Sequence, residues 1–180
     1  MRNNRLENQY MDRKSVGGKV STDVFKVVLT AMFIAVTVAI SRFFIIPVPM
    51  THGNVNLCDA GIFISALLLG PRVGGVVGGA SGFLLDLISG YGQYMWFSLI
   101  FHGAEGLVVG LIAGRKADKK WTKLIAVTVG IVIMVIGYFV ADSILYTMYA
   151  GFIGIGTNLI QGLVGAVIAY LVTPKLKKRI

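Results

Sequence analysis

Cysteine and acidic residues are scarce in this chain of 180 residues. Cys58 is the only cysteine, so the chain has no intrachain disulfide and no metal cluster built from several cysteines. Asp and Glu together number 8 against 17 Lys and Arg, which gives a formal net charge of +9. No run of bases is interleaved with aromatic side chains, so this charge does not indicate a nucleic-acid partner.

A Walker A phosphate-binding loop is also absent. The only Gly-Lys pair, Gly18-Lys19, is followed by Val20 and lacks the upstream glycine of the motif. The chain is therefore not expected to be an ATPase, and ATP that drives it must be bound by another subunit. A cleaved signal peptide is not expected either, because the first apolar stretch is longer than a signal-peptide core and no small-x-small site follows it.

Apolar residues are abundant instead. The chain is 56% hydrophobic, with 23 Gly and a mean hydropathy of +0.78, which is not the composition of a soluble domain. We predict an all-α integral membrane protein with six transmembrane helices. The six apolar stretches are about Val24–Ile46, Leu57–Leu69, Val73–Ser89, Met95–Gly114, Leu124–Leu145 and Phe152–Val172.

The positions of Lys and Arg predict the orientation. With these spans, 16 of the 17 bases lie on one side of the membrane, and Arg42 lies on the other. Basic connections face the cytoplasm and contact anionic lipid, so both termini are predicted to be cytoplasmic. Residues 1–22 form a polar cytoplasmic segment in this interpretation, and residues 23–180 form the membrane domain.

Small residues recur at intervals of four. Glycines with this spacing let helices approach closely in lipid, and we interpret both glycine series as packing surfaces within the chain. Ala31, Ala35 and Ala39 form a third series on the first span, for which internal packing and contact with a partner protein are equally open. The glycine series are Gly70, Gly74, Gly78 and Gly82 on the third span, and Gly106, Gly110 and Gly114 on the fourth.

Polar residues inside the spans gather toward the side opposite the bases. Glu105 is a functional candidate by default, because a carboxylate near the middle of a span costs at least ~2.5 kcal/mol. His102, three positions earlier, shares its helix face. One His and one Glu without a third ligand do not indicate a metal, so no metal and no cofactor are predicted. Asp59 and Asp86 either belong to a site or simply cap helix ends and pair with Arg42.

Aromatic and polar residues at the same depth describe a pocket for a small, flat, polar ligand. The alternative for Trp96 and the nearby tyrosines is a purely structural role in the aromatic belt at a membrane surface. The predicted ligand-binding residues come from the loop after the first span and from the later spans, and are His52, Asn56, Tyr94, Trp96, His102, Glu105, Asp142 and Asn158.

One motif allows a different class of function. Gly79-Ala80-Ser81-Gly82 matches the G-x-S-G nucleophile signature of rhomboid intramembrane proteases, and His102 lies on the next span. A serine nucleophile needs a general base within hydrogen-bonding distance, and the second span lacks the His that rhomboids carry on an earlier span. The protease is the second interpretation, and Ser81 is better explained as a small residue in the glycine series.

Four segments resemble the S components of energy-coupling factor (ECF) transporters. The resemblance is closest to the riboflavin-type branch, which includes proteins assigned to hydroxymethylpyrimidine or vitamin B6 uptake. It covers nearly all of the membrane part but not the charged N-terminal segment. The segments are Asn56–Ala60, Ala66–Gly74, Asp86–Tyr91 and His102–Gly110, with the sequences NLCDA, ALLLGPRVG, DLISGY and HGAEGLVVG.

The resemblance implies a six-helix subunit in a bacterial cytoplasmic membrane that binds a water-soluble vitamin at its outer face, under the loop after the first helix. It implies assembly with a membrane coupling subunit (the T component) and two ABC-type ATPases. In the family an Ala-x-x-x-Ala motif contacts the coupling subunit, and Ala31 and Ala35 match it. The carboxylates and aromatic rings favour hydroxymethylpyrimidine or pyridoxine (vitamin B6), and riboflavin or another vitamin is the alternative.

Overall fold

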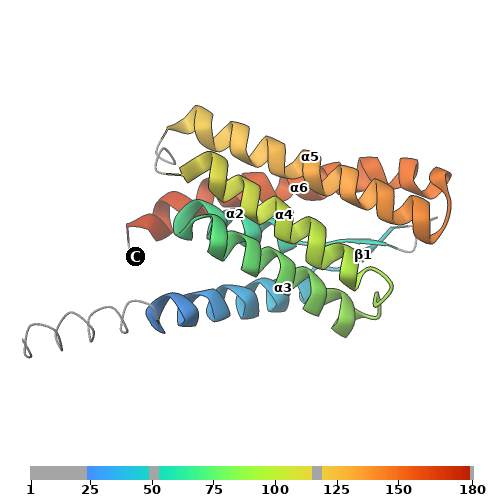
Figure 1. Cartoon of the computed structure of the whole chain (residues 1–180), viewed down its shortest axis with the longest axis horizontal. Helices are drawn as coiled ribbons and strands as arrows, with labels where there is room; N and C mark the ends of the chain where they lie inside the picture. Colours follow the sequence, from blue (N-terminus) through green and yellow to red (C-terminus); the bar gives the residue numbers. More distant parts are fainter. Residues whose placement is uncertain (1–23, 49–52, 115–118, 179–180) are drawn as a thin grey trace, which may run out of the picture.

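The computed structural model describes residues 24–48, 53–114 and 119–178 (Figure 1). The polar segment 1–22 and the predicted site residue His52 lie outside these residues. The described elements are the first helix (Val24–Phe43), β1 (Ile46–Pro47), β2 (Asn54–Val55), α2 (Cys58–Leu69), α3 (Pro71–Ser89), α4 (Met95–Ala113), α5 (Lys120–Leu145) and α6 (Met148–Lys177).

The helical fold class is confirmed. Every predicted apolar stretch contains a helix, with bounds that differ from the prediction by a few residues. Among the described residues, four helices are long and apolar enough to cross a membrane, namely the first helix, α4, α5 and α6. α2 has only 12 residues. Several membrane-spanning helices are therefore supported, while six crossings stay a prediction.

Two local features differ from the predicted secondary structure. The loop after the first helix contains a short antiparallel hairpin, in which Ile46 pairs with Val55 and Pro47 pairs with Asn54. Two-residue strands are too short to show an alternating pattern in a sequence. α6 also continues through Pro174 instead of ending before it, because a proline in the last turns removes only one backbone hydrogen bond close to the helix end.

The glycine series pack α3 against α4, as predicted. A Cβ on Gly78 would overlap the carbonyl oxygen of His102, and a Cβ on Gly106 would overlap the carbonyl oxygen of Gly74. A Cβ on Gly74 would lie 2.6 Å from the Cβ of Ala66 on α2. Backbone therefore meets backbone along this interface, which is the close approach that small residues allow between membrane helices.

The first helix packs on the bundle along one face, on which Phe33 contacts the hydrophobic core. Thr37 and Ser41 are its only buried residues, and they lie one turn apart on the same face. Ala31, Ala35 and Ala39 are exposed on the opposite face. The alanine series does not pack against the described part of the chain, which leaves it available to a partner.

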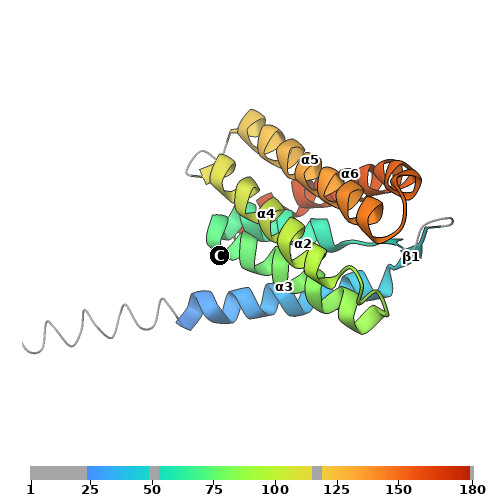
Figure 2. The same ribbon diagram turned by 45° about the vertical axis from the view of Figure 1, so that its right-hand side comes forward.

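The ends of the helices sort into two groups (Figures 1 and 2). The start of the first helix, the end of α4, the start of α5 and the end of α6 lie at one end of the bundle. The hairpin, the α3–α4 connection and the α5–α6 connection lie at the other, which we call the hairpin end. Arg72 and Lys120 start α3 and α5 at the first end, whereas Asp86 and Asp142 lie near their hairpin ends. The structure thus separates bases from acids along the bundle as the sequence predicts.

Candidate functional site

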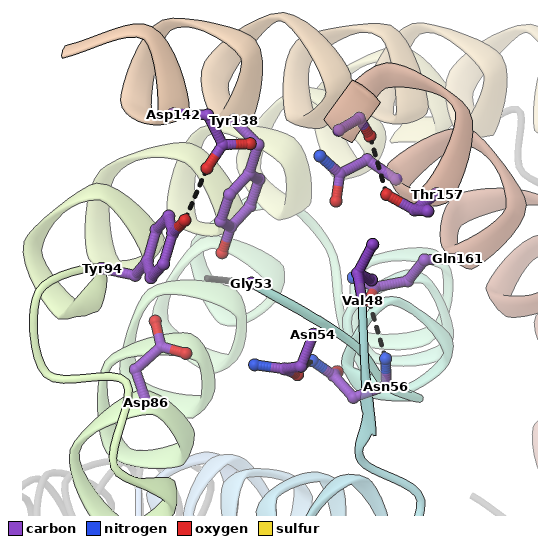
Figure 3. Close-up of a pocket in the computed structure, with 12 residues that line it drawn as sticks. Val48, Gly53, Asn54, Asn56, Asp86, Tyr94, Tyr138, Asp142, Thr157 and Gln161 are labelled. Atoms are coloured by element: carbon purple, nitrogen blue, oxygen red, sulfur yellow. Dashed lines mark hydrogen bonds between the residues drawn. The ribbon is translucent and has the colours of Figure 1, made fainter. Parts of the chain in front are cut away.

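A polar pocket opens at the hairpin end (Figure 3). Its walls come from the hairpin and from α3, α4, α5 and α6, together with the residues that flank them. The space that water can occupy is about 30 Å³, which is room for about two water molecules. The lining residues are Val48, Gly53, Asn54, Asn56, Asp86, Tyr94, Tyr138, Asp142, Gly154, Thr157, Asn158 and Gln161.

Hydrogen bonds fix two sides of this pocket (Figure 3). The Tyr94 hydroxyl donates to Oδ1 of Asp142 at 2.6 Å and so joins α4 to α5. The backbone N–H of Asn56 donates to Oε1 of Gln161 at 2.8 Å, and Oδ1 of Asn56 accepts from the backbone N–H of Cys58 at 2.8 Å. Asn56 therefore ties the hairpin to the start of α2 and to α6.

A chain of hydrogen bonds leads from the pocket wall into the helix bundle. Ser98 donates a short hydrogen bond to Asp86. The hydroxyl of Tyr138 lies 2.5 Å from Oγ of Ser98 and 3.0 Å from Nε2 of His102. On the other side of the ring, Nδ1 of His102 lies 2.8 Å from Oε2 of Glu105. Polar groups of α3, α4 and α5 are thus connected beneath the pocket.

Asp59 of α2 completes a buried cluster with His102 and Glu105. Its Oδ1 lies 3.7 Å from Nδ1 of His102, and the three residues are 0%, 2% and 0% exposed. Both oxygens of Asp59 and Oε1 of Glu105 lack a well-formed hydrogen bond among the described residues, although Gln161 and Glu105 lie beside the Asp59 carboxylate. Gly165 and Gly130 let α6 and α5 approach closely, since a Cβ on them would lie 2.7 Å from the Cβ of Asp59 and 3.4 Å from the Cγ of Glu105. The cluster is therefore sealed inside the bundle.

The structure brings four of the predicted ligand-binding residues to the pocket wall, namely Asn56, Tyr94, Asp142 and Asn158. His102 and Glu105 do not line the pocket and lie beneath it, linked to its wall through Tyr138. Trp96 is 58% exposed and packs edge-on against Phe83, with ring centroids 5.2 Å apart. It therefore faces away from the pocket.

Other wall residues were not in the predicted set. The sequence could have identified Gln161 as a site residue, because it shares a helix face with Asn158. It could also have identified Asp86, which is an acid inside an apolar span. No sequence pattern identifies Tyr138 or Thr157, because a single tyrosine or threonine in an apolar helix is common. Asn54 lies in β2, which the sequence did not reveal.

Two alternatives from the sequence find no support in the described residues. Asp59 and Asp86 form no ion pair with Arg42, since Asp86 bonds Ser98 and Asp59 lies beside His102. Ser81 is fully buried, and its Oγ has no hydrogen-bond partner in the described part of the chain. A rhomboid-type nucleophile needs a general base within hydrogen-bonding distance of the serine. Ser81 has no such base among the described residues, so the protease interpretation gains no support.

Comparison with known proteins assigns the chain to a family. The family described as "ECF-type riboflavin transporter, S component" matches residues 21–178. The chain belongs to this family. It is therefore a transporter subunit of the membrane, not an enzyme.

Relatives of this S component are found among bacteria and archaea. The "Thiamine precursor transporter HmpT" of Lactococcus lactis subsp. cremoris (strain MG1363) is 34% identical over 157 residues, which cover 87% of the chain and 90% of that protein. An uncharacterized protein of Pyrococcus woesei is 34% identical over 136 residues, 75% of the chain and 90% of that protein.

A solved structure shares the fold of this S component. The S component for biotin from an ECF-type ABC transporter has a TM-score of 0.61 at 18% identity, covering 84% of this chain and 92% of that one. The S-component fold that the four sequence segments indicated is confirmed.

Proposed function

We propose that this S component captures hydroxymethylpyrimidine, or as a second choice pyridoxine, in the pocket at its hairpin end. The observation that carries this proposal is the chemistry of the pocket wall. The wall offers carboxylates, side-chain amides and tyrosines, and no Lys or Arg of the described residues lines it. Such a wall accepts hydrogen bonds from amino and hydroxymethyl groups and suits a neutral or cationic ring better than an anion. The name of the Lactococcus relative, a thiamine precursor transporter, also favours a small heterocyclic vitamin precursor as the ligand.

Six of the eight predicted residues have a role in this proposal. Asn56, Asp142 and Asn158 bond the polar edge of the ligand, and Tyr94 packs against its ring. His102 and Glu105 act from beneath by holding Tyr138 in position, which replaces the direct contact expected from the sequence. His52, in the loop between β1 and β2, and Trp96 stay predictions from the sequence.

Ligand entry requires movement of the pocket wall. Room for about two water molecules is too little for a heterocycle. The hairpin and the residues beside it contribute Val48, Gly53 and Asn54 to the wall, and Asn56 ties this segment to α6 through Gln161. We propose that this loop opens to admit the vitamin and closes over it.

Delivery into the cell requires partners. The basic end of the bundle faces the cytoplasm of a bacterial cell in this proposal, and the hairpin end faces outward. A T component docks on the exposed face that carries Ala31 and Ala35, and two ABC-type ATPases supply the energy. Riboflavin is the alternative to these two ligands, because the matching family is described by riboflavin transport.

Calorimetric titration of the detergent-purified chain with hydroxymethylpyrimidine, pyridoxine and riboflavin tests the ligand. Asp142→Asn removes a charged acceptor, and a hydrogen bond to a charged group contributes ~1.5–3 kcal/mol, so the Kd for the preferred ligand should rise roughly 10- to 100-fold. Tyr149→Ala is the matched control, because Tyr149 is 68% exposed and does not line the pocket. Unchanged binding in both Asp142→Asn and Asn158→Ala would place the vitamin elsewhere.

A further inference from the structure

The hydrogen-bond chain beneath the pocket determines the tautomer of a neutral His102. Ser98 donates its only hydroxyl proton to Asp86, so its oxygen must accept from Tyr138, 2.5 Å away. Tyr138 then has no proton left for His102, and its oxygen accepts from Nε2–H across 3.0 Å. Nε2 therefore carries the proton, and Nδ1 presents its lone pair to the two buried carboxylates.

Three electron-rich groups thus converge on one point. Nδ1 of His102 lies 2.8 Å from Oε2 of Glu105 and 3.7 Å from Oδ1 of Asp59, and one ligand atom from each residue falls within 4.8 Å of the others. All three residues are buried in the bundle. Lone pairs and negative charges do not face one another in a dry interior unless something positive lies between them.

A single proton does not satisfy the cluster. A proton between Nδ1 and Oε2 of Glu105 satisfies those two atoms, and Asp59, whose carboxylate lies beside Gln161 and Glu105, then needs a second proton of its own. A cation can contact all three side chains at once. A divalent ion would also balance two ionised carboxylates beside a neutral imidazole.

We propose that Asp59, His102 and Glu105 bind a divalent transition-metal ion of the zinc type beneath the vitamin pocket. One imidazole and two carboxylates form a ligand set that zinc accepts, with metal–ligand distances of about 2.0–2.2 Å. Two tetrahedral ligands at these distances lie about 3.3–3.6 Å apart, so the 3.7 Å separation already fits and the 2.8 Å separation would open slightly around the ion. Tyr138 accepts from the remaining imidazole N–H, as the second partner of a metal-bound histidine does.

The proposed ion shares a wall with the pocket. Gln161 lies beside Asp59 and also lines the pocket, and Tyr138 lines the pocket and holds His102. The ion would therefore fix the inner wall against which the vitamin binds. Its binding does not depend on which vitamin that is.

Metal binding by the full chain in detergent tests the proposal. The chelator-treated protein is dialysed against Zn²⁺ and its metal content measured, and Co²⁺ titration followed by visible absorption reports the affinity. We expect one equivalent of metal in the parent. Asp59→Asn and Glu105→Gln should each weaken binding by more than about 100-fold, and Tyr138→Phe by about 10- to 100-fold through loss of the imidazole partner. Asp142→Asn, a matched acid-to-amide change in the pocket wall, should leave metal affinity unchanged.

Three results would overturn the proposal. The first is a parent protein that takes up neither Zn²⁺ nor Co²⁺, and the second is equal affinity in the parent and the Asp59 and Glu105 variants. The third comes from X-ray absorption at the zinc edge of the parent, which identifies the metal ligands even if those variants do not fold. A nitrogen and oxygen shell with one imidazole supports the site, whereas a sulfur ligand from Cys58 or an imidazole-free shell contradicts it. No vitamin is present in these measurements, so they are independent of the proposed transport function.

Discussion

Gly74→Ala is expected to force α2, α3 and α4 apart. The added Cβ would lie 2.6 Å from the Cβ of Ala66 on α2 and 2.7 Å from the carbonyl oxygen of Gly106 on α4. Ordinary contact begins near 3.4 Å, so the α2 contact alone must open by 3.4 minus 2.6, or 0.8 Å. Neither obstacle is the end of a flexible side chain, and the two lie on different helices. The helices themselves must shift.

Gly103→Ala is the matched control for this prediction. Gly103 belongs to the same α3–α4 interface, but a Cβ there would meet nothing closer than 3.6 Å. Both changes gain the helix propensity of alanine, about 1 kcal/mol, so this gain cancels between them. Overpacking costs ~1–3 kcal/mol. At about 2–4 °C per kcal/mol for a chain of this size, Gly74→Ala should unfold about 2–12 °C below Gly103→Ala.

Thermal unfolding of the two detergent-purified variants beside the parent measures this difference. We expect the order Gly103→Ala at or above the parent and Gly74→Ala below both. Equal midpoints for the two variants would refute the backbone contact between these helices.

Three further predictions concern the partner surface, the orientation and the absence of hydrolysis. Replacing both Ala31 and Ala35 with Trp should preserve vitamin binding by the isolated chain but abolish uptake in the full complex, and a loss of binding would make this face part of the folded core. Reporter fusions after Thr122 and after Gly151 should report cytoplasm and exterior respectively, and one compartment for both would contradict the orientation. Ser81→Ala should leave vitamin binding unchanged, and a fluorophosphonate should not label the parent protein. Labelling of the parent that is lost in Ser81→Ala would support the protease interpretation.

The helices could be predicted because long apolar stretches leave the backbone no partner in lipid except itself. The hairpin could not, because β1 and β2 have two residues each and carry no periodic signal. The start of α6 was missed for a related reason. Thr147 caps it by accepting a hydrogen bond from the backbone N–H of Ala150 at 3.1 Å, but a single threonine between Tyr146 and Met148 is too weak a signal to mark a helix start.

Four residues of the pocket wall on different elements were predicted from their shared depth, whereas the buried cluster beneath it was predictable only where its residues lie on one helix. His102 and Glu105 stood out because they share a face at a spacing of three. Asp59 lies on α2, and no local pattern in the sequence shows that it meets them. Tyr138 connects the cluster to the pocket, yet its sequence neighbours give no reason to separate it from a packing aromatic residue. Contacts between helices depend on packing that one sequence does not reveal.

The glycine interface between α3 and α4 has a consequence for how the ligand range of such proteins changes. Behind the pocket wall formed by α3 and α4, Gly74, Gly78 and Gly106 make backbone contacts that leave no room for an added atom. The opposite wall is built from side chains of the hairpin, α5 and α6, among them Asn54, Asp142 and Thr157. Substitutions that exchange one vitamin for another within this fold are therefore expected on the opposite wall, where a side chain can change without moving a helix.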